Sequence, residues 1–181
     1  KSALIVAAIC PESRMSDLKA DCRVSDDGSI FDDDVVEVYV NTPQRSYFKI
    51  VVNPHGAIWD ESTDAAIIER ATLPILWNPG TKAAVERKDN HWTVEIMIPM
   101  KDFGEIGPSE TYPWGIQVGR TRFTGGTGES WSIAPTGGPY ATLNRWAKEL
   151  YGGGRRDSPS QHAMRPQLGE HLAATGERPA G

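Results

Sequence analysis

The chain has 181 residues, of which 39% are hydrophobic, and it carries a formal net charge of −5. Its length predicts one domain with flanking segments, and its acidic balance, without a Lys/Arg cluster ahead of the C-terminal tail, argues against nucleic acid as a partner. No run approaches the roughly 18 consecutive apolar residues that a membrane-spanning helix needs, so we expect no membrane insertion.

The first predicted element is a buried strand over residues 4–10, LIVAAIC, which Pro11 ends. The chain opens directly on this strand without a starting Met, so we expect that residues are missing upstream. Cys10 and Cys22 are the only two cysteines, too few for a disulfide framework. A single Cys10–Cys22 bridge in an oxidising compartment and two unpaired thiols are both open at this point.

Two runs that alternate at period two follow, over residues 35–40 and 47–52, on either side of the turn-forming connection NTPQRS. Such a pattern predicts two antiparallel strands joined by a hairpin-like loop. One face of each strand is apolar. The opposite face carries Glu37 in the first strand and Lys49 in the second, each flanked by aromatic or aliphatic side chains. We therefore expect a sheet face with a polar centre.

Turn signals and shorter alternating runs continue along the chain. Further strands are predicted over residues 57–60, 82–86, 92–99, 114–122 and 130–134, with a single helical turn over 101–103. Residues 61–80 are ambiguous between a helical turn and an anchored loop. From residue 152 the sequence has almost no β-branched or aromatic side chains, which predicts a disordered tail or linker over 152–181.

Short alternating strands without a long amphipathic helix predict an all-β fold. We expect residues 1–151 to form an antiparallel β-sandwich of the jelly-roll or immunoglobulin-like kind. Its polar face would gather four side chains, one from each of four strands: Glu37, Lys49, Glu95 and Gln117. That expectation requires the four strands to be neighbours.

Five segments carry a resemblance to a known family: FDDDVVEVYVN, YFKIVVNPHGAIWD, HWTVEIMIPMKDFG, YPWGIQVGRTR and SWSIAPTGGPYATLNRWAKEL. In order and spacing the chain resembles the family 9 carbohydrate-binding modules, within the DOMON-like group of β-sandwiches, from residue 2 to about residue 151. The family's first segment has no counterpart here. The resemblance implies non-catalytic binding of an oligo- or polysaccharide of the glucan or xylan type. It also implies a covalently linked polysaccharide-degrading enzyme and an extracellular or cell-envelope location.

The resemblance also implies a site, in which a sugar ring packs between two aromatic rings while charged and amide groups bind its hydroxyls. By position, the first ring is Phe31 and the second is Tyr140, with Trp146 as a competitor. Glu37 and Gln117 take the places of sugar-bonding side chains. Lys49 stands where an Arg is expected, which keeps the charge and loses the planar fork. Arg120 is a further sugar-binding candidate.

A structural calcium ion is a second expectation, because members of the family often hold one. Asp32, Asp33 and Asp34 could supply the oxygen ligands that calcium prefers, together with Asp26, Asp27 and Asn41. The alternative is an acidic loop that is simply solvated, since the spacing matches no EF-hand. No cofactor is expected to be required, and the four His residues show no metal-ligand spacing.

Other functions stay open on the sequence. The sandwich could be a structural spacer or docking domain without a ligand. It could be a haem-binding, cytochrome-like sandwich, with Met97 or Met100 paired with His55 or His91 as axial ligands. Glu37 and Glu95 could form a glycosidase acid/base pair, although the chain is short for a hydrolase. Four Trp residues are predicted to be core or loop anchors: Trp59, Trp77, Trp92 and Trp114.

Overall fold

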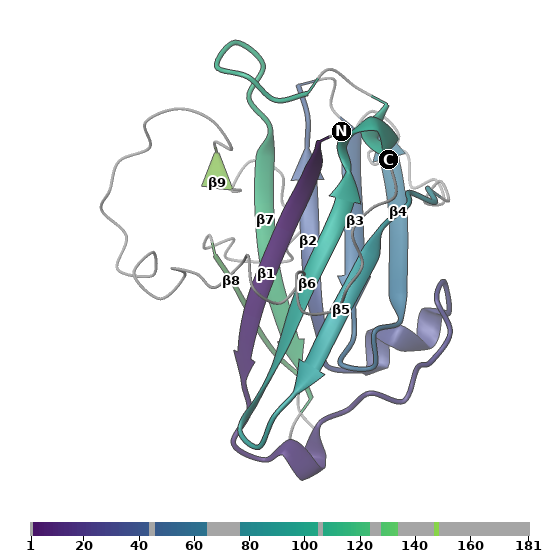
Figure 1. Cartoon of the computed structure of the whole chain (residues 1–181), viewed down its shortest axis with the longest axis vertical. Coiled ribbons are helices and arrows are strands. Elements are labelled where there is room, and N and C mark those ends of the chain that lie inside the picture. The colour runs from purple at the N-terminus through teal and green to yellow at the C-terminus, as the bar shows by residue number, and fades with distance from the viewer. Residues whose placement is uncertain are drawn as a thin grey trace, which may run out of the picture.

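The computed structural model describes residues 2–43, 46–64, 77–104, 107–123, 128–133 and 147–148. Their strands form two antiparallel sheets packed face to face (Figure 1). The first sheet has the order β1-β6-β5, with bounds Ala3–Pro11, His91–Pro99 and Lys82–Arg87. The second has the order β4-β3-β2-β7-β8, with bounds Ile58–Asp64, Ser46–Val52, Val35–Asn41, Gly115–Arg122 and Glu129–Ser132. A short β9, Ala147–Lys148, also pairs with β7.

The predicted β-sandwich is confirmed, and its strands follow the alternating runs of the sequence. In the part of the chain that the structure describes, three 3-10 helices connect them: η1 over Met15–Asp17, η2 over Gly28–Asp32 and η3 over Met100–Phe103. The strand predicted over residues 57–60 is longer and reaches Asp64 as β4. The predicted tail over 152–181 and residues 65–76 of the ambiguous segment lie outside the described residues. Within the described residues, no helix reaches the length and apolarity that crossing a bilayer requires.

The main core lies between the two sheets, where alternate residues of each strand point inward. The strands β2, β3 and β6 supply most of it: Val36, Val38, Val40, Phe48, Ile50, Val52, Trp92, Val94, Ile96 and Ile98. All ten are at most 5% exposed. The apolar faces read from the sequence are therefore the faces that meet. At one end of this core the ring of Phe103 contacts those of Phe48 and Trp114 edge to face.

A second, smaller core lies on the outer face of the larger sheet. The segment between β1 and β2 folds over that face and buries a separate cluster: Cys22, Ile30, Val35, Val51 and Ala57, with Trp59 packed against it. The position of this cluster explains why η2 lies beside the polar centre expected on β2 and β3. The segment thus brings Phe31 onto the outer face of the sheet.

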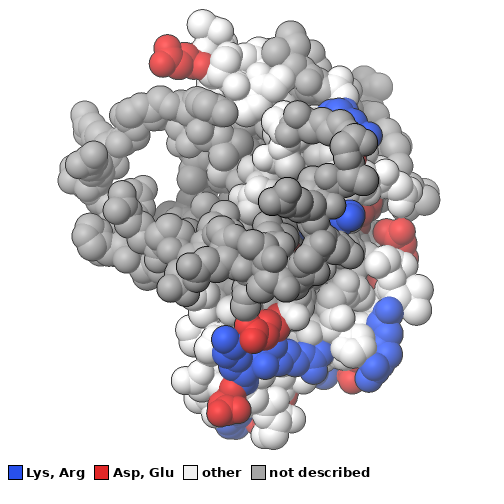
Figure 2. All heavy atoms as spheres, in the orientation of Figure 1, with Lys and Arg blue, Asp and Glu red and all other residues white. Residues whose placement is uncertain are grey.

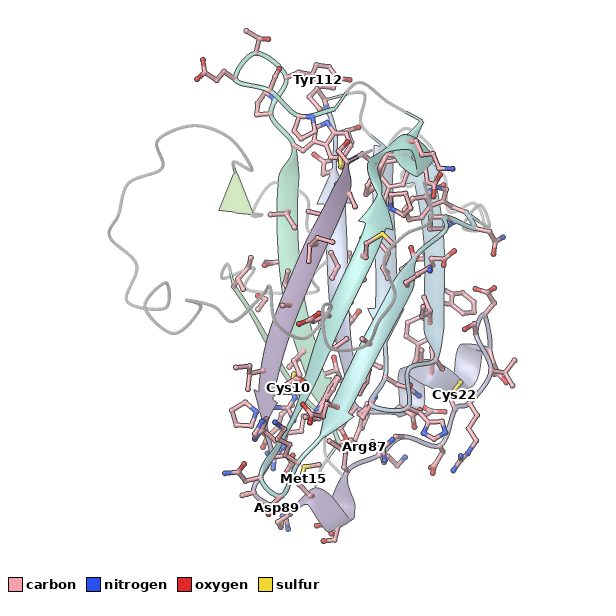
Figure 3. All side chains as sticks on the ribbon, viewed as in Figure 1. Cys10, Met15, Cys22, Arg87, Asp89 and Tyr112 are labelled. Carbon is pink, nitrogen blue, oxygen red and sulfur yellow. The ribbon has the colours of Figure 1, made fainter. Side chains whose placement is uncertain are left out.

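The two cysteines belong to different cores. Cys10 lies between the sheets, whereas Cys22 lies on the outer face, and both are free thiols (Figure 3). The alternative of a Cys10–Cys22 bridge is wrong, because the larger sheet separates the two side chains. Burial raises the pKa of Cys10 to about 12.

Asp60 is a buried acid on the inward-facing side of β4. It is in register with the core residue Ile50 and is 8% exposed. Its Oδ1 atom has no hydrogen-bond partner in the described part of the chain. Burial, with a smaller contribution from Asp26, raises the pKa of Asp60 from 3.8 to about 7.

We expect Asp60→Asn to reduce the pH dependence of unfolding. The folded chain keeps the Asp60 proton up to about pH 7, and the unfolded chain loses it near pH 3.8. Folded molecules therefore bind more protons in this window, and the stability of the wild type falls as the pH rises through it. The free energy of unfolding of Asp60→Asn should therefore rise relative to that of the wild type over the same window, by on the order of 4 kcal/mol. Urea denaturation across this range measures the difference in the free energy of unfolding between the variant and the wild type. A difference that stays constant with pH would contradict the expectation.

Candidate functional site

The polar centre predicted on the larger sheet is present and spans three adjacent strands. The antiparallel register places Lys49 of β3 beside Tyr39 of β2, and Tyr39 beside Gln117 of β7. Glu37 lies in the next row of the same face, because it is two residues from Tyr39. Direct cross-strand neighbours have Cβ atoms about 5 Å apart, so the four side chains form one group.

Glu37 is held in a fixed orientation by three donors. The Tyr39 hydroxyl donates to Oε2 over 2.5 Å and the Thr121 hydroxyl donates to Oε1 over 3.1 Å. The Lys49 ammonium lies 3.5 Å from Oε2. Glu37 is 7% exposed, and Gly119, its partner on β7, contributes no side chain. The carboxylate is therefore a charged acceptor whose position is set before any ligand arrives.

Two aromatic rings border this group where η2 meets β4. The Lys49 Nζ atom lies 4.4 Å from the centroid of the Phe31 ring, which is a cation–π distance. Phe31 is 38% exposed, and its ring meets that of Trp59 at 5.4 Å with an interplanar angle of 66°. The Trp59 Nε1–H donates to Glu61 Oε2 over 3.2 Å. The result is an aromatic corner beside an ion pair.

Trp59 and Glu61 lie beside this group, where the sequence analysis did not place them. Trp59 also packs against the second core, as expected of an anchor. The sequence does contain a feature that indicates their position, the turn Asn53-Pro54-His55-Gly56. A hairpin returning from that turn pairs Trp59 with Val51 and Glu61 with Lys49, and it brings both to the outer face. The other three Trp residues that were expected to be anchors are so placed: Trp92 and Trp114 are buried, and Trp77 packs on Phe48 and Phe103.

Glu95 does not join this group, and the expectation that it would is wrong. It lies on β6 of the smaller sheet, paired with Ala7 and Ala84, on the face that points away from the core. Alternation fixes the face of a strand to which a residue belongs and says nothing about which sheet that strand joins. Glu37 and Glu95 are thus separated by both sheets and cannot flank one glycosidic bond as an acid/base pair.

Arg120 also lies apart from the polar group. It is one of the inward-facing residues of β7, is 2% exposed, and donates from Nη1 to the Pro11 carbonyl over 2.7 Å. Its Nη2 lies 3.5 Å from Glu12 Oε2 and 4.0 Å from Asp34 Oδ1. In this position Arg120 joins the end of β1 to β7.

Glu12, which the sequence analysis did not single out, is the centre of that junction. Arg122 donates to it from Nε over 2.6 Å and from Nη2 over 2.9 Å, in a bidentate pair. Glu12 is 1% exposed, and its hydrogen bonds raise the pKa of Arg122 above its ordinary value. The pair fixes the end of β1 to the larger sheet.

The three carboxylates considered as calcium ligands have different surroundings. Asp33 is buried and accepts from the Asp21 and Cys22 amides and the Asn53 side chain, all within 2.9 Å. Asp34 is also buried and accepts from the Lys19 amide over 2.8 Å, whereas Asp32 is exposed. Burial raises the pKa of Asp34 above its ordinary value.

The described residues include no group of three or more His, Cys, Asp or Glu side chains that could hold a metal ion. The three aspartates therefore form no such group, and the structural calcium ion that the resemblance implies stays a prediction. The residues considered as haem ligands are also separated. His91 begins β6 and Met97 follows six residues later on the same strand, about 20 Å away at the usual rise.

Tyr140 and Trp146, the candidates for the second ring of the clamp, lie outside the described residues. The predicted clamp is therefore represented by Phe31 alone, with Trp59 beside it. The group that the structure does show contains Phe31, Glu37, Lys49 and Gln117 of the predicted site, with four additions: Tyr39, Trp59, Glu61 and Thr121.

No model of a protein family matches this sequence, and no curated protein matches it. A solved structure, that of a "putative carbohydrate-binding protein" from Bacteroides uniformis ATCC 8492, is similar with a TM-score of 0.63 and 13% identity. The match covers 81% of this chain and 72% of that chain. At this level of identity, the similarity between the two structures concerns the fold. It agrees with the two antiparallel sheets described above.

Proposed function

We propose that this chain binds a carbohydrate, without cleaving it, on the outer face of the larger sheet. The observation that carries the proposal is the Glu37–Lys49 pair beside the exposed ring of Phe31. The fold shared with a protein described as carbohydrate-binding gives weaker support. A glucan or xylan ligand, a covalently linked degrading enzyme and an extracellular or envelope location are parts of the proposal that rest on the sequence resemblance.

The chemistry of the face suits a pyranose. A sugar ring has an apolar C–H face, which packs on aromatic carbon, and a rim of hydroxyls that need donors and acceptors. Phe31 and Trp59 offer the aromatic surface at the corner. Lys49 offers donors and Glu37 offers acceptors within reach of that corner, and charge-assisted hydrogen bonds are stronger than neutral ones. Together they would read the orientation of neighbouring hydroxyls.

Calorimetry with glucose, cellobiose and xylobiose tests the proposal directly. We expect Phe31→Ala and Trp59→Ala each to weaken binding about 10- to 100-fold, because a lost ring contact is worth roughly 1–3 kcal/mol. Lys49→Met, which keeps the apolar stem and removes the ammonium, should weaken binding about ten-fold or more. Lys101→Met is the control, because the Lys101 side chain is 84% exposed on η3.

A ligand-free structural role is the second candidate, and one observation favours it. Gln117 is fully buried and Glu37 already accepts from three neighbours, so both could serve the packing of this face alone. If the wild-type chain gives no heat with any of the three sugars at millimolar concentration, the spacer or docking role replaces the carbohydrate proposal. If it binds and neither aromatic variant weakens it, the site lies elsewhere.

A further inference from the structure

Three nitrogen-bearing side chains converge at the end of the sandwich where β3 turns into β4. Arg23 comes from the segment between β1 and β2, His55 from the turn, and Arg87 from the last position of β5. Arg23 Nη1 lies 2.7 Å from His55 Nε2, and Arg87 Nη2 lies 3.2 Å from His55 Nδ1. All three residues are exposed. Figure 3 labels Arg87 at this end, where Figure 2 shows Lys and Arg side chains on the surface with Asp and Glu side chains among them.

Among the described residues, no ion pair balances the positive charge of this cluster. A neutral imidazole has one acceptor nitrogen and a protonated imidazole has none, so at most one of the two Arg–His contacts is a hydrogen bond. Across the described part of the chain, no Asp or Glu oxygen lies within 4.0 Å of a nitrogen of Arg23 or Arg87. Two guanidinium groups therefore face one ring with no described carboxylate between them.

The backbone that carries two of these side chains is held by a fully buried residue, Asn53. Its Oδ1 accepts from the amides of His55 and Ala57, over 3.0 and 2.9 Å. Its Nδ2 donates over 2.7 Å to the carbonyl of Cys22, the residue that precedes Arg23. Arg87 is tied to the same turn, because its Nε donates to the Pro54 carbonyl over 2.8 Å. The cluster is thus arranged in advance, which lowers the cost of binding.

We propose that Arg23, His55 and Arg87 form a binding site for an oxyanion: sulfate, phosphate or carboxylate. Guanidinium groups bind such ligands with two parallel hydrogen bonds. Arg23 Nε and Nη2 and Arg87 Nη1 have no acceptor among the described residues and are free to make those bonds. The oxyanion supplies the missing negative charge and separates the guanidinium groups from the ring. The ligand is either a free ion or an acidic group on a saccharide.

The site is distinct from the proposed sugar face. Lys49 is three residues from Val52, the end of β3, and thus about 10 Å along the strand from the turn that carries His55. The two sites can therefore be tested independently. Lys49→Met should leave oxyanion binding unchanged, whatever becomes of sugar binding.

The test is an NMR titration of the isotope-labelled full chain with sodium sulfate, sodium phosphate or sodium glucuronate, with sodium chloride at matched ionic strength. We expect saturable shifts of the Arg23 and Arg87 Nε–H signals and the His55 ring signals. Arg23→Gln should weaken binding about ten-fold or more. Lys88→Gln is the control, because it removes an exposed positive charge next to Arg87 in sequence. Arg23→Gln is preferred to a change at Arg87, since Arg87 also supports the turn.

Sulfate or phosphate binding more tightly than glucuronate would support the proposal with a free ion or an ester as the ligand. Tighter glucuronate binding would support it with an acidic saccharide. Equal shifts with chloride would overturn the proposal, as would a loss in Lys88→Gln as large as that in Arg23→Gln. If the cluster acted only through net charge, Lys88→Gln and Arg23→Gln would weaken binding equally.

Discussion

Glu12→Gln is expected to lower the free energy of unfolding by about 3–5 kcal/mol, the usual cost of breaking a buried ion pair from one side. Glutamine has nearly the same shape as glutamate, so the loss comes from charge and hydrogen bonding. Arg120, 2% exposed, would keep its buried charge and lose Glu12 as a partner, and Arg122 would lose its bidentate acceptor. Urea denaturation of wild type and variant at one pH gives the difference.

Glu129→Gln is the matched control, because Glu129 pairs with the same Arg122 over 3.0 Å while its side chain is 63% exposed. Exposed ion pairs contribute about 0–1 kcal/mol, so this variant should unfold almost as the wild type does. The comparison sets a buried pair against an exposed pair on the same Arg122 with the same substitution, and Glu12 has the further contact with Arg120. If both variants lose equal stability, burial is not what makes the Glu12 pair important.

Asp33→Ala is expected to cost about 3–5 kcal/mol, since it removes the acceptor of three donors, two of which are buried. The amides of Asp21 and Cys22 and the side chain of Asn53 all donate to this carboxylate. Each donor left without a partner costs about 1–3 kcal/mol. The second core should loosen as well, because Asp33 holds the segment that carries Cys22 and Ile30 against the sheet. Denaturant unfolding followed by Trp fluorescence measures the loss.

Asp32→Ala provides the comparison, because Asp32 is the exposed neighbour of Asp33. Without calcium it should be close to neutral, as most exposed substitutions are. The two variants also test the calcium prediction. If Asp32, Asp33 and Asp34 were joint ligands, added calcium would stabilise the wild type, and Asp32→Ala would abolish that gain. A response of the wild type that Asp32→Ala retains would place any calcium site elsewhere.

Much of this fold can be read from local pattern. The alternation of apolar and polar residues assigned the inward faces of β2, β3 and β6, because the period of a strand is two and one face must be buried. The same alternation placed Glu37 and Lys49 on one polar face, and the hairpin between their strands made them neighbours. Both inferences use residues that are close in sequence.

Two features could not be predicted from the sequence. They are the sheet to which each strand belongs and the contacts between residues that are far apart in the chain. Glu95 has the same alternating context as Glu37 and yet lies on the other sheet, because β6 pairs with β1 and β5. Glu12 looks like an ordinary loop acid, and its role depends on Arg122, 110 residues away. Trp59 reached the site because β4 extends the larger sheet at its edge.

The sequence by itself thus determined which side chains turn inward and which turn outward along each strand, since that choice depends only on near neighbours. The tertiary structure alone decided which outward-pointing side chains share a sheet face, because sheet order follows from how all the apolar faces are buried together. It also decided which buried charges find partners, since those partners lie on distant segments that only the folded chain brings into contact.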